Sequence, residues 1–161
     1  MFTLTKGTDR KANYQSMIET AKAFVEDEND LISLLANLSA LINVYVDDIN
    51  WVGFYLLKEK ELVLGPFQGK PACVRIGEGK GVCGKAVLER KIVNVPDVKK
   101  FPGHIACDSE SVSELVIPFF RNGDVFGVLD LDSPLPARFT ELESKYLGQI
   151  AYLLTAFLYD S

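Results

Sequence analysis

Cys107 lies in the segment FPGHIACDSESVSELVIP, which combines loop-forming glycine, proline and serine with residues that can take part in chemistry. Structural cysteines more often lie within apolar periodic runs, whereas Cys107 is followed by the polar residues 108–111. Cysteines in accessible polar loops ionise and react more readily than buried ones. On composition alone, a reactive and an inert Cys107 are equally favoured.

Two carboxylates share one face of a predicted strand in the segment VLDLDSP. Strand alternation places Asp130 and Asp132 together, opposite Leu129 and Leu131. Glu114 begins the partner strand and joins this face if the register allows it. Such carboxylates usually cover a solvated sheet face. In a pocket they could not all ionise cheaply, so at least one would hold a proton near neutral pH and could donate it.

Trp51 and Tyr55 share a strand face, with Gly53 between them. Aromatic side chains at this spacing commonly belong to a core. The same arrangement, with glycine leaving room between two rings, would also enclose a methyl or thioether group. The pattern favours the two interpretations equally.

Cysteine and histidine together supply four potential zinc ligands, Cys73, Cys83, His104 and Cys107. Structural zinc sites usually take two ligands from one tight turn. Cys73 and Cys83 lie ten positions apart, and only His104 and Cys107 are close in the sequence. The spacing therefore disfavours a metal site. His104 is then either a loop residue or a neighbour that favours the Cys107 thiolate.

Length, charge and hydropathy limit the classes of protein to which the chain can belong. Its 161 residues, 48% of them hydrophobic, predict a single domain over residues 1–161. The net charge is −5 and the lysines are scattered, so the basic patch that nucleic acid requires is absent. The polar start MFTLTKGTDRKANY is unlike a signal peptide, and no apolar run is long enough to span a membrane. We therefore expect a cytoplasmic protein with mainly reduced cysteines and no nucleic-acid or membrane partner.

Apolar residues at helical spacing predict helices over residues 14–25 and 31–42, the second of them capped by Asp30. A shorter helix is expected over residues 82–90. The sequence TELE at residues 140–143 matches a capping box and predicts a helix that continues to the C-terminus.

Alternating and β-branched segments predict two hairpins and two short strands. The predicted strands cover residues 50–57, 61–67, 74–76, 92–95, 114–120 and 125–132. The second hairpin turns at Asn122-Gly123, a pair typical of tight turns, and glycine and proline predict loops over residues 65–84 and 96–111. Hairpins and helices that are segregated in this way indicate an α+β domain, an antiparallel sheet packed by N- and C-terminal helices.

Six segments of the chain occur in the order found in one known family: GPFQGKPAC, GKGVCG, NVPDV, FPGHIACDS, SELVIP and GVLDLDSP. Together they resemble the free methionine-(R)-sulfoxide reductases, which are GAF-domain enzymes. One such motif would be weak, but six in register with three cysteines are specific. The resemblance runs from about residue 51 to residue 134 and implies a GAF-like fold.

The resemblance assigns a role to each cysteine. It implies that Cys107 is the nucleophile and that Cys73 is the resolving cysteine, which closes a disulfide with Cys107. Cys83 matches a third family cysteine that could act as an alternative resolver. Its predicted place on the apolar face of a short helix favours a mainly structural role.

The resemblance also assigns the substrate-binding residues. Glu114, Asp130 and Asp132 match carboxylates that surround the sulfoxide oxygen and the polar groups of the substrate. Trp51 and Tyr55 match aromatic residues that enclose its methyl end.

The implied reaction reduces free L-methionine (R)-S-oxide through thiolate attack, a sulfenic acid and a disulfide that a thioredoxin-type reductant reopens. It implies no bound cofactor or metal, and the family suggests a homodimer. The loop over residues 65–84 would wall a closed pocket that excludes peptide-bound methionine. The alternatives are a regulatory GAF module that binds a small ligand without turnover and a thiol redox sensor. Regulatory modules normally accompany an output domain, which we do not expect in this chain.

Overall fold

Two helices precede the sheet in the computed structural model, which describes residues 3–105 and 107–159. Helix α1 spans Arg10–Asp27 and helix α2 spans Leu31–Tyr45. The backbone N–H of Ser33 donates to the carboxylate of Asp30 at 2.8 Å, which confirms the predicted cap. Both helices extend a few residues beyond the apolar repeats that predicted them, and the added turns contribute buried residues of their own, Asn13 in α1 and Tyr45 in α2.

The first hairpin joins β1 (Trp51–Lys58) to β2 (Glu61–Gly69). Its two turn residues, Glu59 and Lys60, have φ angles of 52° and 69°, the left-handed conformations of a tight hairpin turn. The prediction that a loop begins at residue 65 is wrong, because β2 continues to Gly69. A register shift opposite the segment between Gly53 and Tyr55 accommodates the extra residue, and strand irregularities of this kind tolerate proline.

The middle of the chain contains short elements joined by loops. Strand β3 spans Arg75–Ile76, helix α3 spans Gly81–Glu89, strand β4 spans Val93–Val95 and the 3₁₀-helix η1 spans Val98–Lys100. The first three confirm predicted elements, and η1 is a single turn within the loop predicted over residues 96–111.

The second hairpin and the last helix complete the domain. Strands β5 (Ser113–Arg121) and β6 (Asp124–Ser133) turn at Asn122-Gly123, where φ is 51° and 83°. Helix α4 spans Glu141–Tyr159. The backbone N–H of Thr140 donates to the carboxylate of Glu143 at 2.7 Å, as a capping box requires.

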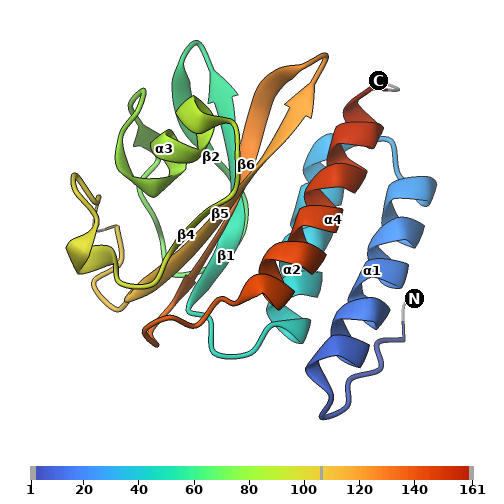
Figure 1. The fold of residues 1–161 in the computed structure, drawn as a ribbon. Helices are drawn as coiled ribbons and strands as arrows, with labels where there is room; N and C mark the ends of the chain where they lie inside the picture. Colours follow the sequence, from blue (N-terminus) through green and yellow to red (C-terminus); the bar gives the residue numbers. More distant parts are fainter. Residues whose placement is uncertain (1–2, 106, 160–161) are drawn as a thin grey trace.

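All six strands form one antiparallel sheet in the order β3-β2-β1-β6-β5-β4, which confirms the predicted fold class. Figure 1 shows α1, α2 and α4 on one side of the sheet, and α3 with the longer loops on the other. A hydrophobic core lies on each side. Among the described residues, no helix combines the length and apolar character needed to cross a bilayer. The α3 side carries the polar residues of the candidate site.

Candidate functional site

Strand register brings three carboxyl groups together on the α3 side of the sheet. Asp132 on β6 pairs with Glu114 on β5 and, across its other edge, with Trp51 on β1. Asp130, two residues before Asp132, pairs with Gly53 and therefore faces the same way. The strand register therefore places Glu114 on the same face as Asp130 and Asp132, as the sequence analysis required. These three residues, Glu114, Asp130 and Asp132, are called the acidic wall below.

The acidic wall is short of hydrogen-bond donors, and two of its members are buried while Asp132 is half-buried. Glu114 and Asp130 are 7% and 6% exposed. One carboxylate oxygen each of Asp130 and Asp132 is buried without a hydrogen-bond partner among the described residues. Buried polar atoms are nearly always paired in folded proteins. Unpaired oxygens that line a pocket therefore indicate a place where a ligand supplies the donors.

Burial also sets the protonation of the acidic wall. The pKa of Glu114 is raised to about 8, mainly by loss of hydration and secondly by the negative charge of Asp132. Burial and the charge of Glu114 raise the pKa of Asp130 well above its usual value, and burial and the charge of Asp130 do the same for Asp132. The wall therefore holds protons at neutral pH, as its crowding predicted.

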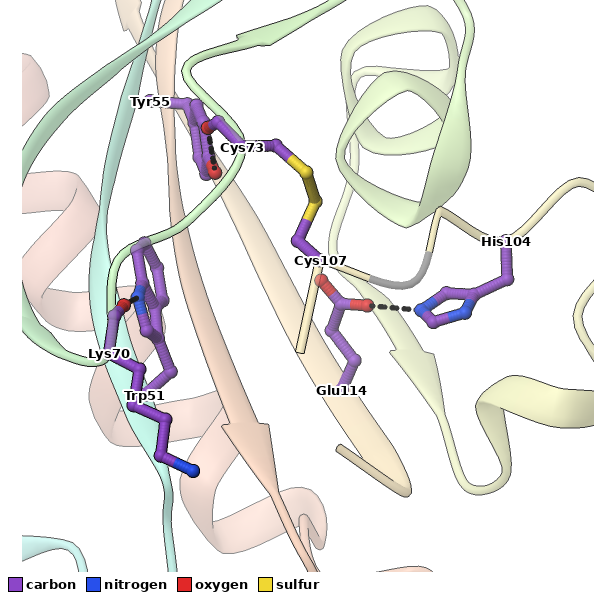
Figure 2. Close-up of a disulfide and its surroundings, with 7 residues drawn as sticks. All are labelled: Trp51, Tyr55, Lys70, Cys73, His104, Cys107 and Glu114. Carbon is purple, nitrogen blue, oxygen red and sulfur yellow. Dashed lines mark hydrogen bonds and ion pairs between the residues drawn. A yellow bond between two sulfur atoms is a disulfide. The ribbon is translucent and has the colours of Figure 1, made fainter. Parts of the chain in front are cut away.

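A disulfide borders this site and joins Cys73, between β2 and β3, to Cys107, between η1 and β5 (Figure 2). The two Cα atoms are 5.6 Å apart although 34 positions separate the residues in sequence. The hydroxyl of Tyr55 donates to the backbone carbonyl of Cys73 at 2.8 Å, which ties the first cysteine to the sheet. The structure thus contains the pairing that the family resemblance implied.

Cys83 remains a free thiol in the first turn of α3. It packs in the apolar core on this side of the sheet, as predicted, but it also lines the pocket. Its sulfur and the carboxyl oxygens of Glu114 and Asp130 all lie within 4.8 Å of one another. The pKa of the Cys83 thiol is raised, mainly by burial and secondly by the charge of Asp130, so the thiol is protonated.

The alternative zinc site does not form in this structure. The sulfurs of Cys73 and Cys107 are bonded to each other and cannot serve as thiolate ligands. His104 faces the acidic wall: its Nε2 atom lies 3.6 Å from Oε1 of Glu114 (Figure 2). Burial lowers the pKa of His104, so this contact joins two groups that are mainly neutral near pH 7.

Trp51 and Tyr55 belong both to the core and to the pocket, so the two interpretations of these rings are compatible. Their ring centroids are 5.9 Å apart, with 25° between the ring planes. The ring of Phe67 stacks on Trp51 with the centroids 5.2 Å apart. The expectation that Gly53 leaves open space between the rings is wrong, because a side chain there would collide with Phe67 and Trp51. Gly53 instead permits the close approach of β2.

One pocket unites the residues predicted from sequence. Its lining includes Trp51, Tyr55, Cys83, Cys107, Glu114, Asp130 and Asp132. Cys73 reaches the pocket through its disulfide with Cys107. The predicted convergence of the carboxylates, the cysteine and the aromatic rings is therefore confirmed in space.

The comparisons with known proteins agree with this geometry. The family model described as GAF domain matches residues 14–157. A free methionine-R-sulfoxide reductase of Escherichia coli is 47% identical over 85% of this chain and 83% of its own, and one of Saccharomyces cerevisiae is 46% identical over 74% and 71%. The crystal structure of free methionine-R-sulfoxide reductase from Neisseria meningitidis, solved with its substrate, superposes with a TM-score of 0.94 at 42% identity, over 98% of this chain and 96% of the other.

This chain belongs to the free methionine-R-sulfoxide reductase family of GAF-domain proteins.

Within this reductase fold, sequence reasoning missed Asp108 and Ser111 at the pocket and Asn50, which holds them in place. The side-chain amide of Asn50 donates to Asp108 at 3.0 Å and to Ser111 at 3.2 Å. Asp108 and Ser111 line the pocket beside Cys107. Both lie in the polar run that was noted only as the surroundings of the cysteine. No periodicity marks a loop residue, so only the contact with Asn50 reveals that the run is anchored to the sheet.

Proposed function

We propose that this protein reduces the (R)-sulfoxide of free methionine, with Cys107 as nucleophile. The observation that carries the proposal is the presence of Cys107 and a protonated acidic wall in the same pocket. Sulfoxide oxygen is a poor leaving group until it is protonated. The Cys107 thiolate supplies the attacking sulfur, and the buried carboxyl groups that face it supply the proton.

In the proposed reaction, the Cys107 thiolate attacks the sulfoxide sulfur while Glu114 gives its proton to the sulfoxide oxygen. The oxygen then passes to the Cys107 sulfur as the substrate's sulfur–oxygen bond and the new bond between the two sulfurs both break, so that methionine leaves and Cys107 becomes a sulfenic acid. The substrate sulfur is reduced by two electrons and Cys107 is oxidised by the same two. Asp130 and Asp132 support Glu114 because more than one negative charge is unfavourable in this crowded, buried wall, so its carboxyl groups tend to keep their protons.

Cys73 is the proposed resolving cysteine. Its sulfur attacks the sulfenic acid on Cys107, the oxygen leaves as water, and the disulfide forms. The Cα separation of 5.6 Å suits such a bond without movement of the backbone. A thioredoxin-type dithiol is the proposed reductant that restores both thiols. Cys83 is proposed as a protonated pocket residue, and the bond between the other two cysteines argues against its being the first resolver.

The pocket offers a partner for each part of a free amino acid. The first backbone N–H groups of a helix have no partner within it, and Gly81, Val82 and Cys83 at the start of α3 line the pocket. They suit the α-carboxylate. The unpaired oxygens of the acidic wall suit the ammonium group, and Trp51 and Tyr55 suit the methyl end. A peptide-bound methionine lacks both charges, which supports selectivity for the free form.

We further propose that residues 1–161 act as one domain, in the cytoplasm and as a homodimer. A reducing compartment would keep Cys73 and Cys107 available as thiols between turnovers. The family resemblance is the support for the dimer.

The deciding experiment supplies racemic free methionine sulfoxide, a thioredoxin system and the purified protein, and follows each epimer by chiral chromatography. We expect consumption of the (R)-epimer alone, with one methionine formed for each. A regulatory ligand-binding module would consume neither epimer, and a thiol redox sensor would cycle its disulfide without forming methionine. N-acetylated, amidated methionine sulfoxide is the matched control substrate, which should remain unreduced.

A further inference from the structure

His104 contacts the acidic wall from the same loop that carries Cys107. Its Nε2 atom lies 3.6 Å from Oε1 of Glu114, and Figure 2 shows the ring turned toward that carboxyl. The His104 side chain is 16% exposed and that of Glu114 is 9% exposed. The imidazole is therefore the partner with better access to water, and it touches the carboxyl to which the proposed reaction assigns the proton.

The proposed reaction leaves Glu114 without its proton after every turnover. Within the part of the chain that the structure describes, the other titratable groups that interact with Glu114 are Asp130 and Asp132 on β6, Cys83 on α3 and Tyr55 on β1. Burial raises the pKa of each of them, so they hold protons rather than release them. A different group has to carry a proton in from water before the next substrate can react.

An imidazole ring suits this task because it has two nitrogen atoms. One nitrogen can take up a proton from water while the other releases one to an adjacent acceptor. Burial lowers the pKa of His104, whereas it raises that of Glu114 to about 8, so transfer from the protonated ring to the carboxylate is favourable.

We propose that His104 relays protons from solvent to Glu114 between turnovers. This inference rests on the proposed reductase activity. The protons balance because each proton that Glu114 gives to the sulfoxide oxygen matches one that the Cys107 thiol releases to water when it ionises. His104 returns that proton from water to the carboxyl and is itself unchanged over the cycle.

The relay predicts that His104 matters after the first turnover more than during it. Reduced protein would be mixed with excess racemic methionine sulfoxide, with dithiothreitol raised until the rate no longer increases, and quenched at times that resolve the first and later methionine molecules. In His104→Gln we expect a first turnover near the wild-type rate, since Glu114 already holds its proton. Later turnovers should slow by about 10²-fold, the lower end of what loss of a proton-transfer group costs. Added imidazole should restore them.

Controls separate a relay from a structural role. His104→Asn should behave like His104→Gln, with both folds verified by near-ultraviolet circular dichroism. Glu110→Gln changes an exposed residue of the same loop that pairs with Lys70, and it should leave all turnovers unchanged and insensitive to imidazole. Equal slowing of first and later turnovers, or slowing that imidazole does not relieve, would overturn the relay, as would unchanged later turnovers. Wild-type protein that consumes no (R)-epimer would instead refute the proposed function itself.

Discussion

The domain buries acidic side chains on both sides of its sheet, but it treats them in opposite ways. On the helix-packed side, Glu143 is fully buried and receives hydrogen bonds from the Tyr14 hydroxyl at 2.8 Å and from Thr140 at 2.7 Å. The guanidinium of Arg138 lies 3.4 Å away. On the α3 side, the carboxyl groups of the acidic wall face one another, and among the described residues none of them forms an ion pair with a lysine or arginine; Glu114 contacts His104.

The two environments move carboxyl pKa values in opposite directions. Burial alone would raise the pKa of Glu143, but the hydrogen bonds from Thr140 and Tyr14 and the charge of Arg138 outweigh it and lower the pKa. Burial raises the pKa of Glu114 to about 8, and the charge of Asp132 adds to the effect. A buried carboxyl supplied with donors stabilises a fold as an anion, whereas one deprived of them keeps a proton that chemistry can use.

The largest expected effect is in the pocket, where Cys107→Ser should abolish turnover. The hydroxyl differs little from the thiol in volume, but it removes the proposed nucleophile. Stability measured by urea unfolding in dithiothreitol, which removes the disulfide from both proteins, should match that of the wild type. Cys73→Ser is the matched control and should release one methionine per chain before it stalls with thioredoxin. More than trace turnover in Cys107→Ser would show that another residue attacks the sulfoxide.

The next largest effect should follow Glu114→Gln, which replaces a protonated carboxyl with a neutral amide. Methionine release in a single turnover should slow by about 10²- to 10⁴-fold, the usual cost of losing a general acid. Substrate affinity should change much less. Stability should hold or rise, because the fold no longer has to keep a buried carboxyl protonated. An unchanged rate with an unchanged pH profile would mean that the proton comes from elsewhere.

Glu143→Gln should give the reverse pattern on the other side of the sheet. It leaves Arg138 buried without its anionic partner, and losing one member of a buried ion pair costs about 3 kcal/mol or more. The free energy of unfolding in urea would measure this loss. The single-turnover rate of the folded fraction should equal that of the wild type. A loss below about 1 kcal/mol, as found for exposed pairs, would contradict the comparison.

The smallest expected effect is a change in the pH dependence of the free energy of unfolding. The native pKa of Glu114 is raised, so its contribution to stability is fully present below the unfolded pKa of 4.5 and is lost as pH rises toward about 8. The native pKa of Glu143 is lowered, so its contribution is present above 4.5 and is lost as pH falls below that value.

Urea unfolding across pH would separate the two contributions. Glu114→Gln should flatten the decline between pH 4.5 and 8, by at most about 1.4 kcal/mol per pH unit for one proton, while Asp130 and Asp132 maintain part of the slope. Glu143→Gln should flatten only the acid side. Parallel curves for both variants would show that the two carboxyl groups titrate alike.

Local patterns predicted much of this fold. Alternation in VLDLDSP placed Asp130 and Asp132 on the face opposite Leu129 and Leu131, and the structure agrees, because side chains must alternate along any strand. Asn122-Gly123 marked a tight turn because its two positive φ angles suit few residues. The capping box at Thr140 was predicted for the same kind of local reason.

Contacts between distant residues escaped prediction. The path of β2 through Pro66 depends on a register shift opposite β1, which no property of the segment itself reveals. The contact between His104 and Glu114 joins a loop to a strand, and the approach of Cys83 to the acidic wall depends on how α3 packs over the sheet. Each requires the relative position of two elements.

The sequence by itself determined which side chains share a face, because backbone geometry repeats every two residues in a strand and every 3.6 in a helix. It also contained the family motifs that identify the nucleophile by resemblance. Only the tertiary structure decided which buried carboxyl keeps a proton. Glu143 and Glu114 are the same residue type at similar burial, and they differ because Arg138 and Tyr14 meet one of them while Asp130 and Asp132 meet the other. Protonation depends on the charges and donors that folding brings within a few ångströms, and these come from distant parts of the chain.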